Sequence, residues 1–129
     1  MLPTKIKLHK ADGHLEIHYA DGSRFELSAE YLRVMSPSAE VKGHGPGQEV
    51  LQYGKRHVKL LNIERAGNYA LRLVFDDGHD SGIYTWDYLH KLGSEYERLW
   101  QDYLNQLAKA GKHRETDVQV VKLIDPGNP

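Results

Sequence analysis

Two Asp-Gly pairs near the start of the chain constrain its fold more than any other feature. Asp12-Gly13 and Asp21-Gly22 interrupt an alternation of apolar and polar residues over positions 5–27. Asp-Gly tolerates the positive φ angles that tight hairpin turns demand, and a period of two is typical of strands with one buried face. The pattern therefore predicts an antiparallel meander with one apolar and one polar face. The polar face is predicted to carry Lys7, His14, Glu16, His18, Arg24 and Glu26.

Strand patterns return in the middle of the chain. Apolar and polar residues alternate over positions 57–63 and 69–75, and a turn signal at 76–78 precedes a further apolar run at 82–86. These segments predict three more short strands. Positions 35–54 are rich in glycine and show no apolar period. We predict a long loop there, and long loops inside compact domains are often functional.

Helix signals occur at three places. Ser28 is the predicted N-cap of a short helical turn, and Asp87 is the predicted N-cap of a short helix over 88–92. Ser94 is the predicted N-cap of a longer helix that has acidic residues in its first turn and ends before Gly111. The spacing of its apolar residues places them on one face, so this helix is expected to pack against the rest of the domain.

Together these elements predict an α+β domain. We expect an antiparallel, meander-rich sheet, or two small sheets, with a short helix after the second hairpin and a longer C-terminal helix packed against it. Residues 1–111 are predicted to form this single domain. The mostly polar segment 112–129 is predicted to be a flexible tail. The valine, leucine and isoleucine residues within 118–124 leave an added edge strand as the alternative.

The composition limits the class of protein. A chain of 129 residues buries enough surface to fold as one domain without a disulfide or a structural metal. The absence of cysteine excludes thiolate metal sites and cysteine nucleophiles. Lysine and arginine number 17 against 18 aspartates and glutamates, so no basic face for nucleic acid is expected. No apolar run approaches the ~20 residues that span a bilayer. We therefore expect a cytoplasmic protein that binds neither nucleic acid nor membrane.

The segment around His79 holds the densest group of chemically active residues. His79 lies in a turn beside Asp80, and His44 lies in a glycine-rich loop. Two histidines and a carboxylate such as Glu40 or Asp80 could hold zinc or non-haem iron. Hydrogen bonds between the imidazole and the carboxylates of the turn explain the same residues without a metal. The sequence contains no Gly-x-Ser-x-Gly motif and no complete catalytic set, so no enzyme is predicted.

Four segments carry a resemblance to a known family. They are LRVMSPSAEV at 32–41, GHGPG at 43–47, NYALRLVFDDGH at 68–79 and GIYTWDYL at 82–89. In this order they resemble the gamma-butyrobetaine hydroxylase-like N-terminal domain family over about residues 12 to 93. The predicted helix after position 94 and the tail lie outside the resemblance.

The resemblance has a direct consequence for metal binding. In the hydroxylases such a domain precedes an iron- and 2-oxoglutarate-dependent catalytic domain, and it carries a structural zinc held by three cysteines and one histidine. The resemblance places the cysteine positions at Ser36, Ser38 and Val41 and the histidine at His79. Serine hydroxyls and a valine cannot replace thiolates as zinc ligands. The resemblance therefore implies the fold and argues against the zinc, and no cofactor is expected.

The resemblance also bears on function. A similar domain is appended to some Mrp-type iron–sulfur cluster carrier ATPases, which implies an accessory role near iron–sulfur cluster assembly. We predict a non-catalytic binding or adaptor module that recognises a protein partner, either iron–sulfur machinery or a partner enzyme. The predicted surface is the loop 36–47 with the turn 79–81, and its candidate residues are Arg33, Ser36, Ser38, Glu40, His44, His79 and Asp80. The alternative is a metal-binding protein or metal-dependent enzyme that uses His44, His79 and a carboxylate.

Overall fold

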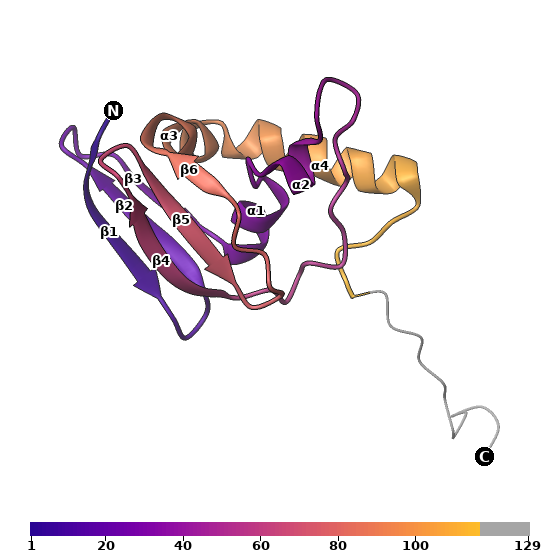
Figure 1. Ribbon diagram of the computed structural model, residues 1–129, viewed down its shortest axis with the longest axis horizontal. Coiled ribbons are helices and arrows are strands. Elements are labelled where there is room, and N and C mark those ends of the chain that lie inside the picture. The colour runs from indigo at the N-terminus through magenta and orange to yellow at the C-terminus, as the bar shows by residue number, and fades with distance from the viewer. Residues whose placement is uncertain (117–129) are drawn as a thin grey trace, which may run out of the picture.

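A computed structural model describes residues 1–116 of the chain as two small antiparallel sheets with helices (Figure 1). The first sheet contains β1 (Pro3–His9), β2 (His14–Tyr19) and β3 (Arg24–Leu27), and the second contains β4 (Leu60–Ala66), β5 (Ala70–Phe75) and β6 (Ile83–Thr85). The helices are α1 (Ala29–Val34), α2 (Ala39–Lys42), α3 (Trp86–Ser94) and α4 (Tyr96–Ala110). The predicted α+β class, with two small sheets and a longer C-terminal helix, is confirmed.

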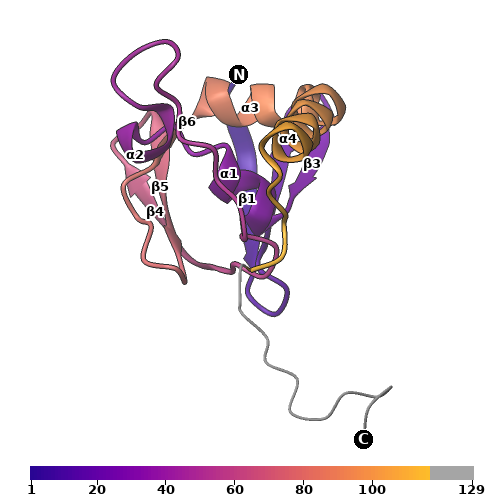
Figure 2. The ribbon, with the colours of Figure 1, turned by 90° about the vertical axis from the view of Figure 1, so that its right-hand side faces the viewer.

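The main core lies between the two sheets, where helix α1 is also placed (Figure 2). Its fully buried members include Leu15, Ile17, Leu32, Leu73, Phe75 and Leu89. Two buried tyrosines satisfy their hydroxyl groups inside this core, as buried tyrosines usually do. Tyr31 Oη donates to the carbonyl of Leu92 at 2.7 Å, and Tyr84 Oη donates to the carbonyl of Leu32. Tyr84 thereby ties β6 to α1.

Both predicted hairpins of the first sheet are present. Leu15 of β2 pairs with Leu8 of β1 and with Leu27 of β3. Gly13 and Gly22 occupy the two turns with φ angles of 71° and 89°. Side chains other than glycine rarely adopt these angles, which explains why each turn signal ends in glycine.

The predicted polar face of the first sheet has Glu16 at its centre. This residue is only 7% exposed, because other polar side chains cover its carboxylate. His9 Nε2 lies 2.8 Å from Glu16 Oε1, His18 bonds the other carboxylate oxygen, and Arg24 lies 3.6 Å away. The hydrogen bond from His18, followed by that from His9, lowers the pKa of Glu16 to about 2. The predicted polar face is therefore present, but Glu16 at its centre is covered by neighbouring side chains and is not exposed to solvent.

The segment 35–54 contains helix α2, where the sequence predicts only a loop. Ser38 supplies the N-cap, since its Oγ accepts a hydrogen bond from the backbone N–H of Glu40 at 3.2 Å. A helix of four residues is too short to show an apolar period, which is why the pattern missed it. The predicted strand 57–63 is also displaced, because β4 begins later and continues to Ala66.

The boundary between β6 and α3 lies earlier than predicted. Thr85, and not Asp87, is the N-cap of α3, and its Oγ1 accepts from the N–H of Tyr88 at 3.1 Å. Trp86, predicted as the end of a strand, is therefore the first residue of the helix. Both Thr85 and Asp87 are good N-cap residues, so sequence preference alone could not choose between them.

Helix α3 also continues through Gly93, beyond the predicted end of the helix at Leu92. Ser94 is its last residue, so Ser94 does not cap α4, and α4 begins without a side-chain cap. A Cβ atom at Gly93 would overlap the ring of Phe25, so glycine at this position permits close packing of α3 against β3. No helix within residues 1–116 is both long and apolar enough to cross a membrane.

The first residues after α4 are held against the domain. The carbonyls of His113 and Arg114 accept hydrogen bonds from the N–H groups of Gly54 and Arg56, at 2.9 and 3.0 Å. The guanidinium of Arg114 also pairs with the buried carboxylate of Glu30 through two contacts of 2.9 and 2.6 Å. The predicted tail 112–129 begins within the described residues, and its part over 117–129, with the alternative edge strand over 118–124, lies outside them.

The loop after α2 closes on itself at its base. The N–H of Val50 donates to the carbonyl of Val41 at 2.8 Å. Gly43 ends α2 with a φ angle of 74°, and a Cβ atom there would overlap the backbone carbonyl of Gln48. Gly45 has an ordinary φ angle and open space around it. The loop therefore depends on glycine at position 43 and not at position 45.

These two glycines give a matched test of the loop. Gly43→Ala introduces both a strained φ angle and a backbone overlap, so we expect the free energy of unfolding to fall by about 1–3 kcal/mol. Gly45→Ala meets no atom and should change it by less than about 0.5 kcal/mol. Urea denaturation of both variants measures the difference. Equal stability of the two variants would contradict the loop geometry.

Candidate functional site

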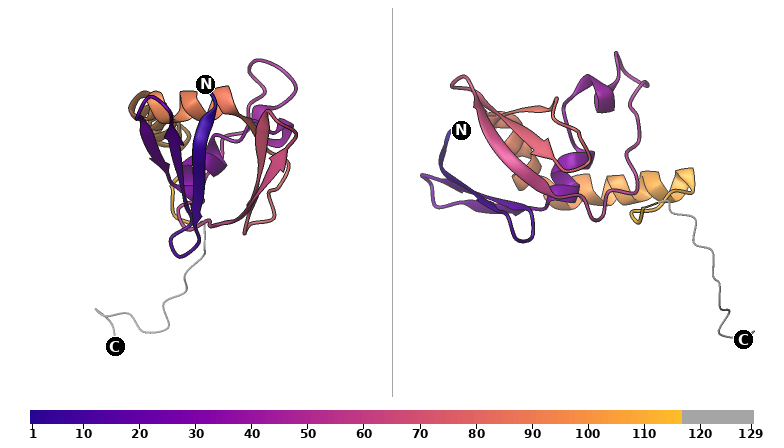
Figure 3. Two further views of the ribbon diagram at one scale, coloured as in Figure 1. Left: turned by 90° about the vertical axis from the view of Figure 1, so that its left-hand side faces the viewer. Right: turned by 60° about the horizontal axis from the view of Figure 1, so that its bottom comes forward.

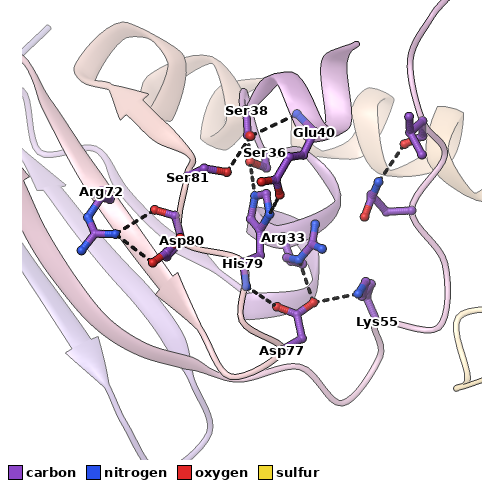
Figure 4. A network of polar contacts seen from close by, with 12 residues as sticks. Arg33, Ser36, Ser38, Glu40, Lys55, Arg72, Asp77, His79, Asp80 and Ser81 are labelled. Atoms are coloured by element: carbon purple, nitrogen blue, oxygen red, sulfur yellow. Dashed lines mark hydrogen bonds and ion pairs between the residues drawn. The ribbon is translucent and has the colours of Figure 1, made fainter.

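The imidazole of His79 is the centre of a buried polar network (Figure 4). The turn after β5 positions it, because the N–H of Phe75 donates to the His79 carbonyl at 3.0 Å. The side chain is only 2% exposed. Its Nε2 lies 2.8 Å from Ser36 Oγ, and its Nδ1 lies 3.0 Å from a carboxylate oxygen of Glu40. Both ring nitrogens are therefore engaged by side chains of the protein.

The partners determine where the imidazole proton lies. An ionised carboxylate can only accept, so Nδ1–H donates to Glu40 and Nε2 accepts from the hydroxyl of Ser36. The lone pairs of Ser36 Oγ in turn accept from the N–H of Ser38 at 3.2 Å. This arrangement gives each donor an acceptor with His79 in its neutral form.

The same network fixes helix α2. Ser38 caps the helix with its Oγ, and that oxygen also lies 2.7 Å from the hydroxyl oxygen of Ser81. Glu40 belongs to α2 and holds His79, whereas Ser81 and His79 belong to the segment between β5 and β6. Two segments distant in sequence are therefore joined by two separate hydrogen bonds.

Asp77 lies beside this network and collects cations. Its carboxylate accepts from Arg33 Nε at 2.8 Å, from Lys55 Nζ at 2.7 Å and from the N–H of His79 at 3.2 Å. Burial alone would raise the pKa of Asp77, but the hydrogen bonds from Lys55, His79 and Arg33 outweigh it and lower the pKa to about 2. Asp77 is therefore ionised at neutral pH.

The environment also lowers the pKa of His79. Burial is the largest cause and the Arg33 charge is the second, and both outweigh the opposing attraction of Glu40. A lowered pKa means that the neutral imidazole is favoured in the folded protein. The neutral form is the one that the hydrogen bonds to Ser36 and Glu40 require.

The candidate residues named from the sequence divide into two groups. Four of them are buried, namely Arg33, Ser36, Ser38 and His79. The other three are exposed, namely Glu40, His44 and Asp80. Asp80 pairs with Arg72 at 3.2 Å, and His44 lies in the loop after α2. The structure thus brings Arg33, Ser36, Ser38, Glu40 and His79 together and leaves the other two outside the network.

The geometry does not support the alternative of a metal site at His44, His79 and a carboxylate. Within residues 1–116, no group of three or more histidine, aspartate or glutamate side chains is placed to hold a metal ion. The ring nitrogens of His79 are already bonded to Ser36 and Glu40.

The positions that the resemblance assigns to zinc do converge in space. Ser36 Oγ contacts His79, the N–H of Ser38 contacts Ser36, and Val41 is buried one turn further along, where its N–H donates to the Ser38 carbonyl at 2.9 Å. Two hydroxyls and an alkyl group do not make a zinc cage. The residues present therefore do not fit the metal, and a hydrogen bond joins two of the four positions directly.

The order Ser36–His79–Glu40 matches the connectivity of a nucleophile, a base and an orienting acid in acyl-transfer enzymes. A nucleophile must reach a substrate carbonyl, but Ser36 is fully buried. Gly82 lies so close to Ser36 that a Cβ atom at position 82 would be 2.6 Å from Ser36 Oγ. In this structure the hydroxyl of Ser36 is bonded to His79 and is covered by Gly82 on one side.

The sequence predicted part of this site and missed the rest. The resemblance pointed to Ser36, Ser38 and His79. Lys55 was missed, because a lysine in a loop carries no local signal for a contact with a residue far away in the chain. Ser81 lies in the predicted turn 79–81, but its bond to Ser38 was not predicted. Asp77 was read only as part of a turn, which it is, yet its carboxylate also binds Arg33.

Comparison with known proteins identifies the class to which this small α+β domain belongs. The family model for gamma-butyrobetaine hydroxylase-like, N-terminal domains matches residues 6–90. The chain therefore belongs to the gamma-butyrobetaine hydroxylase-like N-terminal domain family. No curated protein sequence matches the chain.

Solved structures agree with this assignment. A protein solved by NMR in solution is 55% identical, with a TM-score of 0.79, and the match covers 95% of this chain and 97% of that one. A second NMR structure is 45% identical, with a TM-score of 0.74 and coverage of 96% and 95%. A crystal structure of a DUF971 family protein of unknown function from Acidithiobacillus ferrooxidans is 36% identical, with a TM-score of 0.58 and coverage of 70% and 90%.

The lowered pKa of His79 predicts how stability depends on pH. Between the folded and the unfolded pKa the unfolded state binds more protons, so the free energy of unfolding should fall as the pH drops below the ordinary value of 6.5. His79→Gln removes this titration and should make the fall shallower. The exposed His44→Gln variant should keep the wild-type slope. Urea denaturation between about pH 7.5 and pH 5.5 tests this, and equal slopes for all three proteins would contradict it.

The convergence of the four positions predicts that zinc binding can be built in. The triple variant Ser36→Cys, Ser38→Cys, Val41→Cys supplies three thiolates beside His79, and we expect it to bind one zinc ion with a Kd below about 1 μM in calorimetry. Adding His79→Ala should weaken the binding. A folded triple variant that takes up no zinc would show that these side chains do not converge as described.

Proposed function

We propose that the chain is a non-catalytic binding module that presents the loop 43–50 to a protein partner. The observation that carries the proposal is the position of this loop, which projects from the domain while its base is attached to the buried network (Figure 1). Helix α2 leads directly into the loop, and α2 is held by the bonds of Ser38 and Glu40 to the segment between β5 and β6.

A loop held in this way suits recognition. The bond between Val50 and Val41 and the tight turn at Gly43 fix its two ends before any partner arrives. A pre-organised loop loses less conformational freedom when it binds, and this improves affinity without additional contacts.

The surface chemistry of the loop fits a protein interface. Val50 is 53% exposed and thus offers an apolar contact, with Glu49 and Gln48 as polar neighbours. A cavity of about 190 Å³ lies beside it, lined by Val41, Lys42, Glu49, Val50, Leu51 and Tyr88 among others. An apolar anchor beside a small pocket, surrounded by polar residues, is the usual arrangement of an interface centre and its rim.

The candidate residues take two different roles in this proposal. Glu40 and His44 are exposed next to the loop and serve as contacts, with Asp80 at the margin. Arg33, Ser36, Ser38 and His79 are buried and act as support. The surface proposed from the sequence is thereby narrowed to the α2 end and the loop that follows it.

A protein partner connected with iron–sulfur cluster assembly is the first candidate to test. The resemblance to domains appended to Mrp-type carrier ATPases supports this choice. The buried His79 of this module is hydrogen-bonded to Ser36 and Glu40. The module would therefore act by contact with the partner protein and would not bind the cluster through His79.

Substitution of Val50 tests the proposed surface. Val50→Asp places a charge in the apolar centre of the loop and should abolish capture of the partner, whether an Mrp-type carrier ATPase or another protein recovered from native lysate. Tyr69→Asp introduces the same charge at an exposed aromatic residue in the turn between β4 and β5, and capture should persist. Failure of the wild type to recover any reproducible partner, or equal capture by both variants, would contradict the proposal.

A further inference from the structure

A cleft of about 520 Å³ lies where the first strand of each sheet meets the other, away from the loop 43–50. Strands β1 and β4 lie next to each other and are in contact (Figure 3). Gly13, in the turn between β1 and β2, packs against Leu60 at the start of β4. The cleft lies further along β4, where Ile6 and Ile63 line it. Ligand pockets in proteins typically have volumes of about 300–1,000 Å³, so the cleft has the size of a small-molecule site.

The lining of the cleft is largely apolar. The residues that line it from the edge of the main core are Ile6, Ile63, Leu71 and Trp86. The indole of Trp86 is held in place, because its Nε1 donates to the carbonyl of Asn68 at 2.7 Å. Leu2 also lines the cleft and is 66% exposed, so it leaves apolar surface that a ligand would cover.

Arg65 lies on the core side of its strand and not on the solvent side. In the pairing of β4 with β5, Arg65 is opposite the buried Leu71, and Ile63 is opposite the buried Leu73. Residues that are directly opposite each other in an antiparallel pair share one face of the sheet. Arg65 is nevertheless exposed and lines the cleft, so its aliphatic stem follows the apolar lining and its guanidinium lies at the mouth.

The mouth of the cleft carries positive charge without a carboxylate. The guanidinium of Arg65 donates from Nη2 to the neutral side-chain oxygen of Asn68 at 3.1 Å, and Lys5 also lines the cleft. Within residues 1–116, neither Lys5 nor Arg65 forms an ion pair, and no aspartate or glutamate lines the cleft. A guanidinium has five N–H donors, so donors remain for the oxygens of an anion.

We propose that this cleft binds a small amphipathic carboxylate, with its apolar body between β1 and β4 and its carboxylate group on Arg65. A guanidinium can donate two parallel hydrogen bonds to a carboxylate, and such pairs are among the strong polar contacts in proteins. Lys5 adds a second positive charge that selects an anion over a neutral or cationic ligand. The site is independent of the partner surface at the loop 43–50, because the two share no residue.

The two tryptophans of the chain allow a direct test with octanoate as the probe. Trp86 lines the cleft, whereas Trp100 lies in α4 and does not line it. Titration of octanoate into the ¹⁵N-labelled full chain should shift the indole Nε1 signal of Trp86 and leave that of Trp100 unchanged. The amide signals of Ile6 and Ile63 should shift as well, while those of the loop 43–50 stay in place. Octanol has the same apolar chain without the charge and should bind at least about tenfold more weakly, and octylammonium should produce no shift.

Two arginine variants separate the charge of Arg65 from positive charge in general. Arg65→Gln should raise the Kd for octanoate at least about tenfold and leave the Kd for octanol unchanged. Arg98→Gln removes an exposed arginine of α4 outside the cleft and should bind octanoate as the wild type does. Absence of selective shifts at Trp86, equal affinity for octanoate and octanol, or equal binding by both variants would overturn the proposal. None of these results would affect the capture experiment with Val50→Asp.

Discussion

The arrangement of α2 and of the segment between β5 and β6 depends on the hydrogen bonds at the two ring nitrogens of His79. Ser36 follows α1 and Glu40 lies in α2, whereas His79 lies between β5 and β6. One side chain therefore joins the α1–α2 region to a segment about 40 residues further along the chain. A buried polar group that loses a partner costs about 1–3 kcal/mol. Breaking either bond would leave a buried polar group without a partner, so the network favours this one conformation.

This network occupies the place at which the family resemblance puts a structural zinc. Metal coordination and hydrogen bonding can both fix the orientation of a histidine ring. Hydrogen bonding requires no metal, but it contributes less free energy to folding. The remaining stability comes from the apolar core and from tyrosines such as Tyr31 and Tyr84, whose hydroxyl groups bond to backbone carbonyls inside it. The scaffold can therefore hold α2 and the loop after it in place by packing and hydrogen bonds.

Local patterns in the sequence predicted several turns and helix ends, although the cap signals at Asp87 and Ser94 were wrong. The Asp-Gly turns, the Ser28 cap and the end of α4 at Gly111 each depend on a few neighbouring residues, and each is present. The burial of Glu16 and of His79 could not be predicted in this way, because their covering partners come from other strands and helices. For the same reason the sequence left a metal and a hydrogen-bonded turn as open alternatives at His79, and the contacts of its ring with Ser36 and Glu40 support the hydrogen-bonded arrangement.

The protonation state of His79 tests this account most directly. The ¹⁵N chemical shifts of its ring in the purified full chain, measured near about pH 7 with and without a chelator, report the state of each nitrogen. The account predicts a protonated Nδ1 and an unprotonated, hydrogen-bonded Nε2, both unchanged by the chelator. A metal-bound nitrogen that the chelator releases, or two protonated nitrogens at this pH, would contradict it.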